Sequence, residues 1–545
     1  MRTIVHSGIA TIGLALTVAA QGPPPPPPPL PPVPVPPGNP ITLEKSLLGK
    51  ALFWDEQLSA TSTVACGTCH INSVGGSDPR TVNDPSSVAP GPDGVLGTPD
   101  DVLGSLGVVR NLADGRLEKD ELFELRPQVT GRKSPSMINA AFANELFWDG
   151  RAPDRFDDPI TGSPILPFNA ALESQAVGPP VSSVEMGHQG IAWPEIEGRL
   201  GPLEPLRLAE SIPADLEAWI GDRDYNDLFA EAFGSGEVTA VRIALAIATY
   251  ERTLISGQSA FDAGTLNPQQ NRGRAIFFGQ GRCALCHGGP LFTDQNFHNV
   301  GVTPALEDPG RFEVTGNPGD RGRFKTPSLR NVGLRAPYFH NGSAQSLNQV
   351  VAFYNRAGDF SFNQDPLIQP LGLAPLQRAD LVAFLQALTD LRVVGEEAPF
   401  DRPLLYSESS RVPLVFGQST PGTGGFQPQF VALEPAYINN PSLTVGVDGG
   451  LGGAPASLLF DLSAHPTGFP AFGAVLHLSF SPASRVLFQG NLEGSGPGNG
   501  WNSVSLEIPN AVGLVGTSVF MQWIVFDQGA PGVLSATPGL ELPVF

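Results

Sequence analysis

The pentapeptide Cys-x-x-Cys-His occurs twice in this chain, and its two copies use all four cysteines of the 545 residues. Their cysteines and histidines are Cys66, Cys69 and His70 in the first copy, and Cys283, Cys286 and His287 in the second. This pentapeptide is the attachment site of c-type haem, where two thioether bonds fix the porphyrin and the histidine ligates the iron. The sequence therefore predicts two covalently bound haem c groups, with His70 and His287 as iron ligands.

Two other uses of paired cysteines fit this spacing less well. A structural zinc site usually places its second cysteine pair roughly some tens of residues after the first, whereas residues 70–282 separate the two pairs here. A thioredoxin-like dithiol is expected beside a βαβ pattern and needs no repeated histidine. Haem attachment is therefore the interpretation that we carry forward.

The beginning of the chain has the features of an export signal. Arg2 precedes a mostly apolar run over residues 9–18, and residues 18–20 offer a small-residue cleavage site. Residues 1–20 are therefore predicted to direct the protein to the periplasm, or otherwise out of the cytoplasm, with an uncleaved anchor as the alternative. The run is too short for a convincing membrane span, and we expect none in the mature chain. Residues 21–40 form a proline-rich linker that favours extended polyproline II.

Acidic residues outnumber basic ones, and the formal net charge is −21. Such a charge argues against nucleic acid as a partner, because the phosphate backbone would be repelled. An acidic surface suits a basic redox partner, although many exported proteins are acidic without having one.

The pattern of apolar residues changes near residue 399. Before this point, apolar residues recur with the spacing of helices. Three such stripes contain Leu48 and Leu52, Ala244 and Ala248, and Leu381 and Leu388. After this point, short runs rich in Val, Leu and Phe alternate with Gly, Pro, Asn and Ser, as in an all-β sandwich. The predicted fold is mainly α, with two cytochrome c-type haem domains over residues 41–260 and 261–398, followed by a β-sandwich accessory domain over residues 399–545.

Residues 75–126 are rich in Asp, Gly and Pro and are expected to form an irregular loop. Asp93, Asp100 and Asp101 within this stretch could hold a calcium ion, but their spacing does not match an EF-hand loop. We therefore interpret these acidic residues as parts of solvated turns.

Seven further motifs connect the chain with a known family. They are Gly-Lys-Ala-Leu-Phe at residues 49–53, Ser-Pro-Ser-Met-Ile-Asn-Ala-Ala-Phe at 134–142, Phe-Trp-Asp-Gly-Arg-Ala at 147–152, Glu-Met-Gly at 185–187, Tyr-Glu-Arg-Thr-Leu at 250–254, Phe-Lys-Thr-Pro-Ser-Leu-Arg-Asn at 324–331 and Pro-Tyr-Phe-His-Asn-Gly-Ser at 337–343. Over residues 47–391 the chain resembles the bacterial dihaem cytochrome c peroxidases and their relative MauG, which oxidises tryptophans in a partner protein. The linker and the β-sandwich lie outside this resemblance.

The resemblance implies which residues handle peroxide. Cleavage of a peroxide O–O bond needs a group that moves a proton between the two oxygens, and such acid–base help is worth about 10²–10⁴ in rate. The family places a glutamate there, which corresponds to Glu185, and a glutamine ten residues earlier, which corresponds to Gln175. Trp148 resembles the tryptophan that lies between the two haems and couples them. The alternative for Trp148 is a core aromatic residue of a helix that packs on the porphyrin.

The resemblance also separates the two irons. Family members that need prior reduction carry a histidine soon after the first haem motif, whereas no histidine occurs here between His70 and His188. The first haem is therefore expected to be five-coordinate, with His188 as the rival ligand. Tyr354 occupies the place of the methionine that caps the second haem in the peroxidases, and MauG also has tyrosine there. Methionine raises the potential of haem iron, so an oxygen ligand should favour higher oxidation states; His298 and His340 are the alternatives.

A calcium ion between the haems is the last feature that the resemblance implies, and this chain departs from it. The family holds calcium with an asparagine side chain and two backbone carbonyls. The asparagine position, fifteen residues before Trp148, is Lys133, and the carbonyl positions fall at Arg335 and Pro337. Two new cations fit poorly beside a divalent ion, so we expect the Lys133 ammonium to replace calcium.

Residues 154–169 are an insertion relative to the family and could alter access to the pocket of Glu185.

These features predict a peroxidase that reduces hydrogen peroxide at the His70 haem and draws the second equivalent from a haem ligated by His287 and Tyr354. Its electron donor would be a small cytochrome c or a cupredoxin. Two alternatives stay open at this point. One is a MauG-like haem oxidase that acts on a protein or a small molecule, and the other is a non-catalytic dihaem electron-transfer protein.

Overall fold

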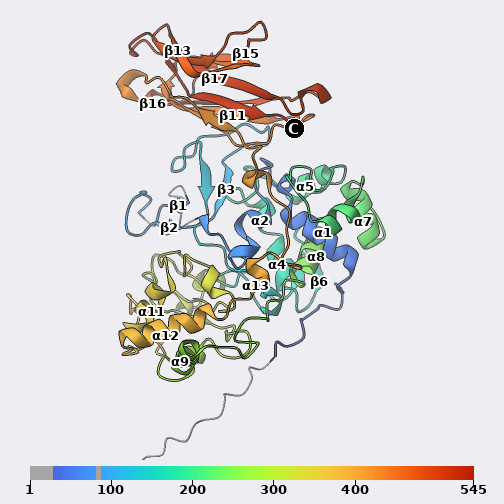
Figure 1. The fold of residues 1–545 in the computed structure, drawn as a ribbon, viewed down its shortest axis with the longest axis vertical. Coiled ribbons are helices and arrows are strands. Elements are labelled where there is room, and N and C mark those ends of the chain that lie inside the picture. The colour runs from blue at the N-terminus through green and yellow to red at the C-terminus, as the bar shows by residue number, and fades with distance from the viewer. Residues whose placement is uncertain (1–28, 81–86, 92) are drawn as a thin grey trace, which may run out of the picture.

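The structure is a computed structural model that describes residues 29–80, 87–91 and 93–545. Three parts follow one another along the long axis of the molecule: the C-terminal strands, the N-terminal helices, and a third group of helices between residues 268 and 386 (Figure 1). The predicted signal over residues 1–20 and the first residues of the linker lie outside the described residues. Each of the three parts has its own hydrophobic core.

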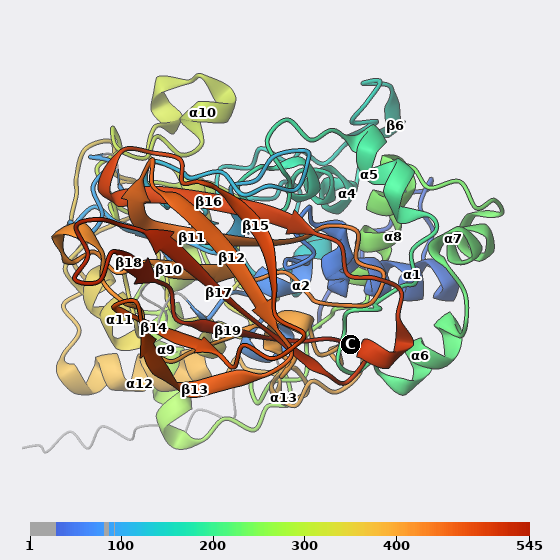
Figure 2. The ribbon, with the colours of Figure 1, turned by 90° about the horizontal axis from the view of Figure 1, so that it is seen from above.

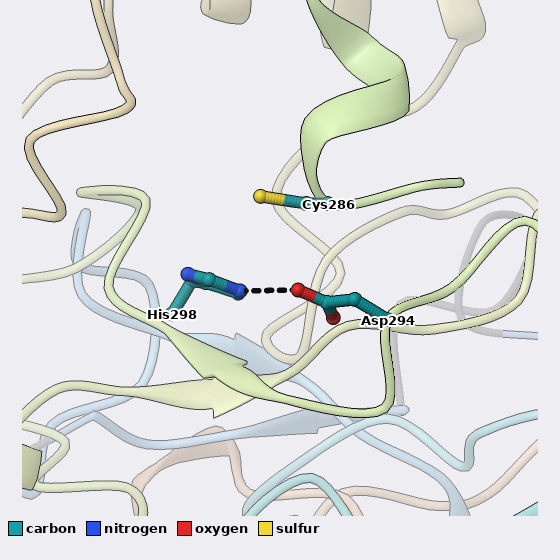
Figure 3. Close-up of side chains that lie close together, drawn as sticks. All are labelled: Cys286, Asp294 and His298. Carbon is teal, nitrogen blue, oxygen red and sulfur yellow. Dashed lines mark hydrogen bonds and ion pairs between the residues drawn. The ribbon is translucent and has the colours of Figure 1, made fainter.

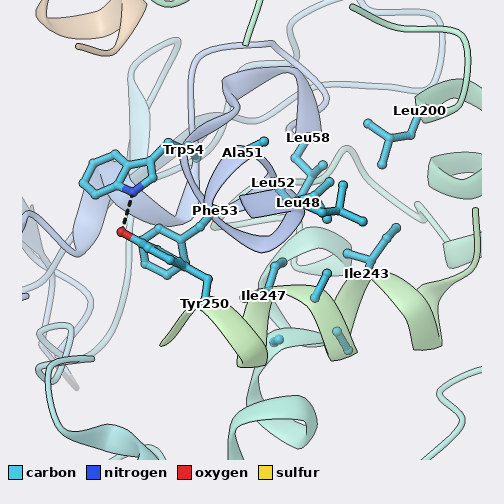
Figure 4. Close-up of a cluster of buried hydrophobic side chains, with 14 of the residues drawn as sticks. Leu48, Ala51, Leu52, Phe53, Trp54, Leu58, Leu200, Ile243, Ile247 and Tyr250 are labelled. Carbon is cyan, nitrogen blue, oxygen red and sulfur yellow. Dashed lines mark hydrogen bonds between the residues drawn. The ribbon is translucent and has the colours of Figure 1, made fainter. Parts of the chain in front are cut away.

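Two long helices form the centre of the N-terminal part. α1 (Leu43–Trp54) and α8 (Ala240–Glu251) cross at Gly49, where an added Cβ would lie 1.9 Å from the carbonyl oxygen of Ala246. The buried side chains at this crossing include Leu48, Leu52, Ile243 and Ile247 (Figure 4). Both helices had been predicted from the spacing of their apolar residues, and the structure confirms them.

Shorter elements complete the N-terminal part. The other helices are α2 (Cys66–Cys69), α4 (Ala171–Ala176), α5 (Trp193–Leu200), α6 (Ala214–Ile220) and α7 (Tyr225–Phe233). The short strands are β1 (Val88–Ala89), β2 (Val102–Leu103), β3 (Leu106–Val109), β4 (Pro127–Val129), β5 (Phe156–Asp157) and β6 (Pro164–Leu166). Antiparallel pairs join β1 to β2, β3 to β4 and β5 to β6.

The expectation of an irregular loop over residues 75–126 is wrong for β1, β2 and β3. Strands of two to four residues are too short to show the alternation by which a strand is recognised in a sequence. The acidic residues of this stretch do form turns: the carboxylates of Asp100 and Asp101 accept hydrogen bonds from the backbone N–H groups of Asp93 and Gly97 at 3.2 and 2.7 Å.

The group of helices between residues 268 and 386 packs around aromatic rings. α9 (Pro268–Phe278) and α12 (Pro375–Gln386) cross at Gly273, where an added Cβ would lie 1.9 Å from the carbonyl oxygen of Asp380. The core beneath them contains the rings of Phe261, Phe277, Phe292 and Phe384. The other elements are β7 (Phe297–His298), α10 (Phe312–Thr315), β8 (Phe324–Lys325) and α11 (Leu347–Asn355).

The C-terminal part is rich in strands, as predicted. A six-stranded sheet has the order β15-β12-β17-β19-β9, with β18 paired to β17, and a three-stranded sheet has the order β10-β11-β16. Buried side chains of β11, β12 and β17 share one core between these sheets, and Figure 2 shows their strands from above. The bounds are β9 (Leu414–Phe416), β10 (Gln429–Ala432), β11 (Leu443–Gly452), β12 (Pro455–Asp461), β13 (Ala464–Ala471), β14 (Ala474–Leu478), β15 (Arg485–Asn491), β16 (Gly496–Leu506), β17 (Ser518–Phe526), β18 (Leu534–Ala536) and β19 (Gly539–Pro543).

The parts are joined by more than the chain itself. α13 (Leu391–Val394) and the residues after it return to the N-terminal core, where Val393, Phe400 and Leu405 are buried. The strand-rich part contacts the segment between β3 and β4. Thr444 and Ser503 donate their hydroxyl hydrogens to the carbonyl oxygens of Gly115 and Leu117, each at 2.9 Å, and Lys119 pairs with Asp448 at 2.8 Å.

None of the helices in the described ranges combines the length and the apolar character that crossing a membrane requires.

Candidate dihaem centre

The first Cys-x-x-Cys-His motif forms α2 and the turn after it. Gly67 lies so close to Trp54 that an added Cβ would be 2.2 Å from the indole ring. The indole Nε1 in turn donates a hydrogen bond to the Tyr250 hydroxyl at 3.0 Å, which links α1 to α8 (Figure 4). These contacts place both cysteines of the motif and the His70 ring at the wall of a cavity of about 970 Å³.

His70 is oriented as a metal ligand needs to be. Its Nδ1 donates a hydrogen bond to the carbonyl oxygen of Gly76 at 3.2 Å, which fixes the ring and leaves the Nε2 lone pair for a metal. Burial lowers the pKa of His70, so the imidazole is in the neutral form that metal binding requires.

The rival ligand His188 is engaged elsewhere. Its Nε2 lies 2.8 Å from a carboxylate oxygen of Glu195, and its Nδ1 lies 2.9 Å from the carbonyl oxygen of Gln189. His188 is also absent from the described residues that line the cavity of His70. The structure therefore does not bring this residue to the first motif.

Glu185 and Gln175 line the same cavity as His70. Gln175 lies in α4, and Glu185 follows α4 in the loop 182–187. Burial raises the pKa of Glu185, and the nearby Arg151 guanidinium offsets this effect only in part. The sequence prediction that both side chains share one pocket agrees with this placement, while their roles remain predictions.

Two short strands hold the loop that carries Glu185. The backbone N–H of Val108 in β3 donates to the carbonyl oxygen of Val184 at 3.1 Å, and the Gln128 side chain in β4 donates to that of Ser183 at 2.7 Å. Residues 154–169, the insertion that could have altered access, form the β5–β6 pair, and none of them lines this cavity.

The second motif has a smaller cavity of about 220 Å³, lined by Cys283, Cys286 and His287. His287 repeats the arrangement of the first motif: its Nδ1 donates to the carbonyl oxygen of Phe292 at 2.9 Å. Burial lowers the pKa of His287 as well. Both histidines thus present a neutral ring with a free Nε2 to a cavity that also holds two cysteines, which suits a haem attached at each motif.

Tyr354 lies in α11 and lines the second cavity. Burial raises the pKa of its phenol, and the neighbouring thiols of Cys286 and Cys283 act in the same direction. The structure therefore brings this residue to the second motif, as the sequence predicted.

The alternative ligand His298 has partners at both ring nitrogens. Its Nδ1 lies 2.6 Å from Asp365 and its Nε2 lies 2.9 Å from Asp294. Figure 3 shows His298 and Asp294 next to Cys286, an arrangement that could hold a metal ion if the thiol were free. The Cys286 thiol belongs to the haem motif, however, and both ring nitrogens of His298 already contact the carboxylates of Asp365 and Asp294. The other alternative, His340, stacks on Phe324 with 3.6 Å between ring centroids.

The two cavities differ in the balance of acidic and basic residues that line them. In the part of the chain that the structure describes, the second cavity is lined by no acidic residue but by the cations Lys133, Arg282, Lys325 and Arg335. The first cavity is lined by the cations Arg132, Lys133 and Arg151 and by seven acidic residues, namely Asp100, Asp101, Glu185, Glu251, Glu307, Asp308 and Glu313. A cationic lining in a chain of net charge −21 fits a cofactor that carries carboxylates, as the propionate-bearing haem does.

Trp148 lines both cavities. Its Nε1 donates a hydrogen bond to the backbone carbonyl of Lys133 at 2.7 Å, and its ring centroid lies 6.3 Å from that of His340. The side chain is held in a turn, so the alternative reading as a residue of a helix is wrong. A tryptophan between the two motifs is the placement that the sequence predicted.

Lys133 is buried at the boundary between the two cavities. Its ammonium donates hydrogen bonds to the carbonyl oxygen of Arg335 at 3.3 Å and to the hydroxyl of Ser77. Burial lowers the pKa of Lys133 to about 7, and the Arg335 guanidinium adds to this effect. The lysine thus contacts one of the two carbonyl groups that the family uses for calcium.

Sequence reasoning missed several acids of the first cavity, among them Glu251. Glu251 was recognised only as part of the Tyr-Glu-Arg-Thr-Leu motif, yet it lines the cavity together with Ile247 one helical turn earlier. The i, i+4 spacing of these two residues on α8 is the signal that could have revealed a shared face.

The fold and the two cavities define a class of protein: a chain with two c-type haem sites separated by one tryptophan. The comparisons with known proteins narrow this class. Residues 43–270 match the family described as di-haem cytochrome c peroxidase. Cytochrome-c peroxidase IdrP1 of Denitromonas iodatirespirans is 30% identical over 392 residues, which cover 65% of this chain and 84% of the relative.

Two further relatives carry the two names that the resemblance suggested. Methylamine utilization protein MauG of Methylorubrum extorquens is 30% identical over 361 residues, which cover 65% of this chain and 80% of MauG. Cytochrome c551 peroxidase of Pseudomonas aeruginosa is 30% identical over 394 residues, which cover 69% of this chain and 86% of the relative. A crystal structure of a MauG-like protein associated with microbial copper homeostasis is 26% identical, with a TM-score of 0.49, and covers 70% of this chain and 97% of that one.

The chain belongs to the di-haem cytochrome c peroxidase family. This confirms the resemblance that its motifs suggested. The family implies two haem c cofactors, and the relatives named cytochrome c peroxidases are oxidoreductases.

Proposed function

We propose that this chain is a c-type dihaem peroxidase that reduces hydrogen peroxide in the cavity of His70, with the second equivalent drawn from the other haem. One observation carries the proposal: Glu185 and Gln175, an acid and an amide, face the cavity of the first motif. When bound, the haem groups supply the redox-active iron for this chemistry. The overall reaction takes two electrons and two protons for each hydrogen peroxide and gives two molecules of water.

Glu185 has the properties of the group that moves protons. Its carboxylate would accept the proton of one peroxide oxygen and return it to the other, while the Gln175 amide holds the peroxide by hydrogen bonds. Burial raises the pKa of Glu185, which brings the carboxyl closer to the neutral pH at which acid–base catalysis is most effective. The Val108 and Gln128 contacts hold the loop of Glu185 in place, as such a role requires.

Trp148 and Tyr354 are assigned to the second equivalent. Trp148 offers a path between the cavities because its ring lines both of them. Tyr354 is the side chain that we assign as the second protein ligand of the His287 haem, with His298 occupied by two carboxylates. Methionine raises the potential of a haem iron, so a phenol oxygen in its place would make the second site better suited to store an oxidising equivalent than to donate an electron.

Low-temperature electron paramagnetic resonance of the ferric protein tests this ligation. We expect a high-spin axial signal from the first haem and a low-spin signal from the second, and we expect Tyr354→Phe to remove only the low-spin signal. Two low-spin signals in the native protein would mean that a side chain such as Met186, which lines the first cavity, occupies the sixth position of the His70 iron.

Steady-state turnover tests the reaction itself. We expect the holoprotein to oxidise a reduced small cytochrome c or cupredoxin when hydrogen peroxide is added, because an acidic surface attracts a basic donor. Tyr354 favours a second candidate, a MauG-like oxidase, for which modification of a partner protein would replace this turnover. Ferric protein that does not react with peroxide would leave a dihaem electron carrier.

Lys133 is proposed to take the place of the calcium ion. It supplies a cation to the Arg335 carbonyl at 3.3 Å, and a second cation beside it leaves little electrostatic room for a divalent ion. We expect chelators to leave the activity of the native protein unchanged and to abolish that of Lys133→Asn, which restores the asparagine of the family. Loss of native activity on chelation would refute the replacement.

We infer that the protein is exported to the periplasm. The inference rests on the predicted signal over residues 1–20 and on the two haem motifs, since bacteria attach c-type haem outside the cytoplasm. Detection of the haem-loaded protein in the periplasmic fraction, and its loss when residues 1–20 are deleted, is the test.

A further inference from the structure

Glu251 is a buried acid that the proposed reaction leaves without a role. It is the last residue of α8 and is 4% exposed. Its side chain lines the cavity of the first haem motif, and its Oε2 has no hydrogen-bond partner within the described residues. A buried carboxyl without a partner is costly and calls for an explanation.

The cation next to Glu251 in the sequence is already taken. Arg252 makes two contacts of 2.8 Å with the carboxylate of Glu173 on α4, and both side chains are at most 1% exposed. Asn39 adds a hydrogen bond of 2.8 Å to Glu173, and Lys45 on α1 donates to Asn39 at the same distance. The charged groups of this network are paired with one another, so none of them forms an ion pair with Glu251.

A charge on Glu251 interacts with Cys66, one of the two cysteines of the first haem motif. The Cys66 thiol on α2 lies close enough to interact electrostatically with Glu251. The charged groups that act on Glu251 itself are Arg252 on its own helix and Glu173 on α4. Burial is the dominant influence and raises the pKa of Glu251 to about 8, Glu173 adds to the rise, and Arg252 opposes it. The carboxyl therefore holds its proton at neutral pH until a positive charge is added to the cavity, which favours release of the proton.

We propose that Glu251 is a redox-linked proton site of the first cavity, which binds one proton from solvent when one electron enters that cavity and releases it when the electron leaves. The inference rests on the proposed function, because it requires a redox-active haem attached at Cys66 and Cys69. Its physical basis is charge balance: removal of an electron adds one positive charge to a low-dielectric site, and a carboxylate nearby stabilises that charge. The step exchanges one electron and one proton, so the net charge of the cavity does not change.

Spectroelectrochemical titration of the holoprotein tests the proposal without use of enzyme activity. The midpoint potential of the first haem is measured over a pH range that brackets the pKa of Glu251, and its high-spin spectrum separates it from the second haem. We expect the native potential to fall as pH rises, by up to a tenfold change in the electron-transfer equilibrium per pH unit, which is about 59 mV. Glu251→Gln, which cannot ionise, should show a smaller slope in this range, where Lys133 of the same cavity, with a pKa of about 7, still titrates.

Two control variants complete the design. Glu434→Gln removes another buried carboxyl, one that lines neither cavity and accepts a hydrogen bond from the backbone N–H of Thr444, and it should keep the native slope. Glu185→Gln should keep most of the native pH slope of the midpoint potential. A native slope in Glu251→Gln, or loss of the slope in Glu185→Gln instead, would overturn the assignment of the proton to Glu251.

The outcome is separable from that of the proposed function. A protein without peroxidase turnover whose pH slope decreases in Glu251→Gln would keep the inference and refute the peroxidase. A protein with turnover that keeps its native slope in Glu251→Gln would do the reverse. If Glu251→Gln fails to fold, Glu251→Leu, which fills a similar volume and cannot ionise either, serves for the same comparison.

Discussion

The same five-residue motif lies at the wall of two very different cavities. In each, the histidine Nδ1 donates to a nearby backbone carbonyl, that of Gly76 in the first and Phe292 in the second. The first cavity is large, about 970 Å³, and rich in carboxylates, whereas the second is about 220 Å³ and is lined by cations. The motif therefore places its histidine in the same way in both copies, and residues from distant parts of the chain make the two cavities different.

The contrast in charge has a consequence for the two potentials. Cations around a site stabilise the electron-rich state, and buried acids stabilise the electron-poor one. The cations that line the second cavity therefore favour the electron-rich state of a redox group held there. In the first cavity, burial raises the pKa of both Glu185 and Glu251, which makes their negative charge harder to hold than that of an exposed acid.

The largest effect is expected from Glu185→Gln, which removes the acid that distinguishes the first cavity. Because general acid–base help is worth about 10²–10⁴ in rate, kcat/KM for hydrogen peroxide should fall by about that factor. Steady-state kinetics with a reduced cytochrome c measures it. Glu195→Gln, which alters an acid paired with His188 outside the cavity, should leave the rate near the native value.

Tyr354→Phe tests the second cavity and should affect turnover less than Glu185→Gln does. It removes one oxygen from the described lining and leaves the aromatic ring. We expect the low-spin signal of the second haem to disappear while the first haem keeps its high-spin signal. Tyr338→Phe is the matched control, because Tyr338 lines the same cavity and donates its hydroxyl hydrogen to the Val332 carbonyl at 3.0 Å; it should leave both signals in place.

The motifs made much of this centre predictable from the sequence. The spacing of the motifs alone predicted that His70 and His287 lie beside cysteine pairs. The resemblance predicted that Glu185 belongs with the first motif and Tyr354 with the second, and the structure places them in the corresponding cavities. Their roles stay predictions. The strand-rich C-terminal part was also evident from its short apolar runs, whereas the exact domain boundaries remain untested.

What the sequence did not reveal depends on tertiary contacts. Glu251 faces the first cavity only because α8 crosses α1 at Gly49, and no local pattern encodes that crossing. The cations of the second cavity come from segments far apart in the chain, among them Lys133 and Lys325. The turn around Trp148 was likewise read as a possible helix, because a single aromatic residue carries no periodicity.

The next expected effect is a pH dependence of the folding stability that comes from the first cavity. Glu251 lines that cavity, whereas the described lining of the second cavity contains no acid. The pKa of Glu251 rises from 4.5 to about 8 on folding, so the folded protein binds a proton that the unfolded chain releases between these pH values. The stability that this proton provides is fully present below pH 4.5 and is lost as pH rises toward 8, by about 1.4 kcal/mol per pH unit.

Thermal unfolding of the holoprotein at several pH values measures this loss. The native Tm should fall relative to that of Glu251→Gln as pH rises from 4.5 to 8, because glutamine has no proton to lose. Equal pH dependence of the two proteins would show that the Glu251 side chain does not hold a proton in the folded protein over this pH range, and the chemical contrast between the cavities would then rest on Glu185 and the other acids of the first cavity.

The smallest effect is expected at the contact between the strand-rich part and the first cavity. Thr444 and Ser503 donate hydrogen bonds to the Gly115 and Leu117 carbonyls, in the segment that joins β3 to β4. These two strands hold the loop of Glu185, and a neutral hydrogen bond is worth about 0.5–1.5 kcal/mol. A combined Thr444→Val and Ser503→Ala variant should therefore lower kcat/KM for peroxide by less than about tenfold.

The spectra of this variant carry more information than its rate. A change confined to the high-spin signal of the first haem would mean that the C-terminal part supports one cavity and not the other. Ser484→Ala is the control, since Ser484 donates to Asp461 at 2.7 Å within the strand-rich part, away from the segment between β3 and β4. If this control altered the first haem equally, the effect would come from general loosening of the strands, and the β3–β4 contact would lose its special role.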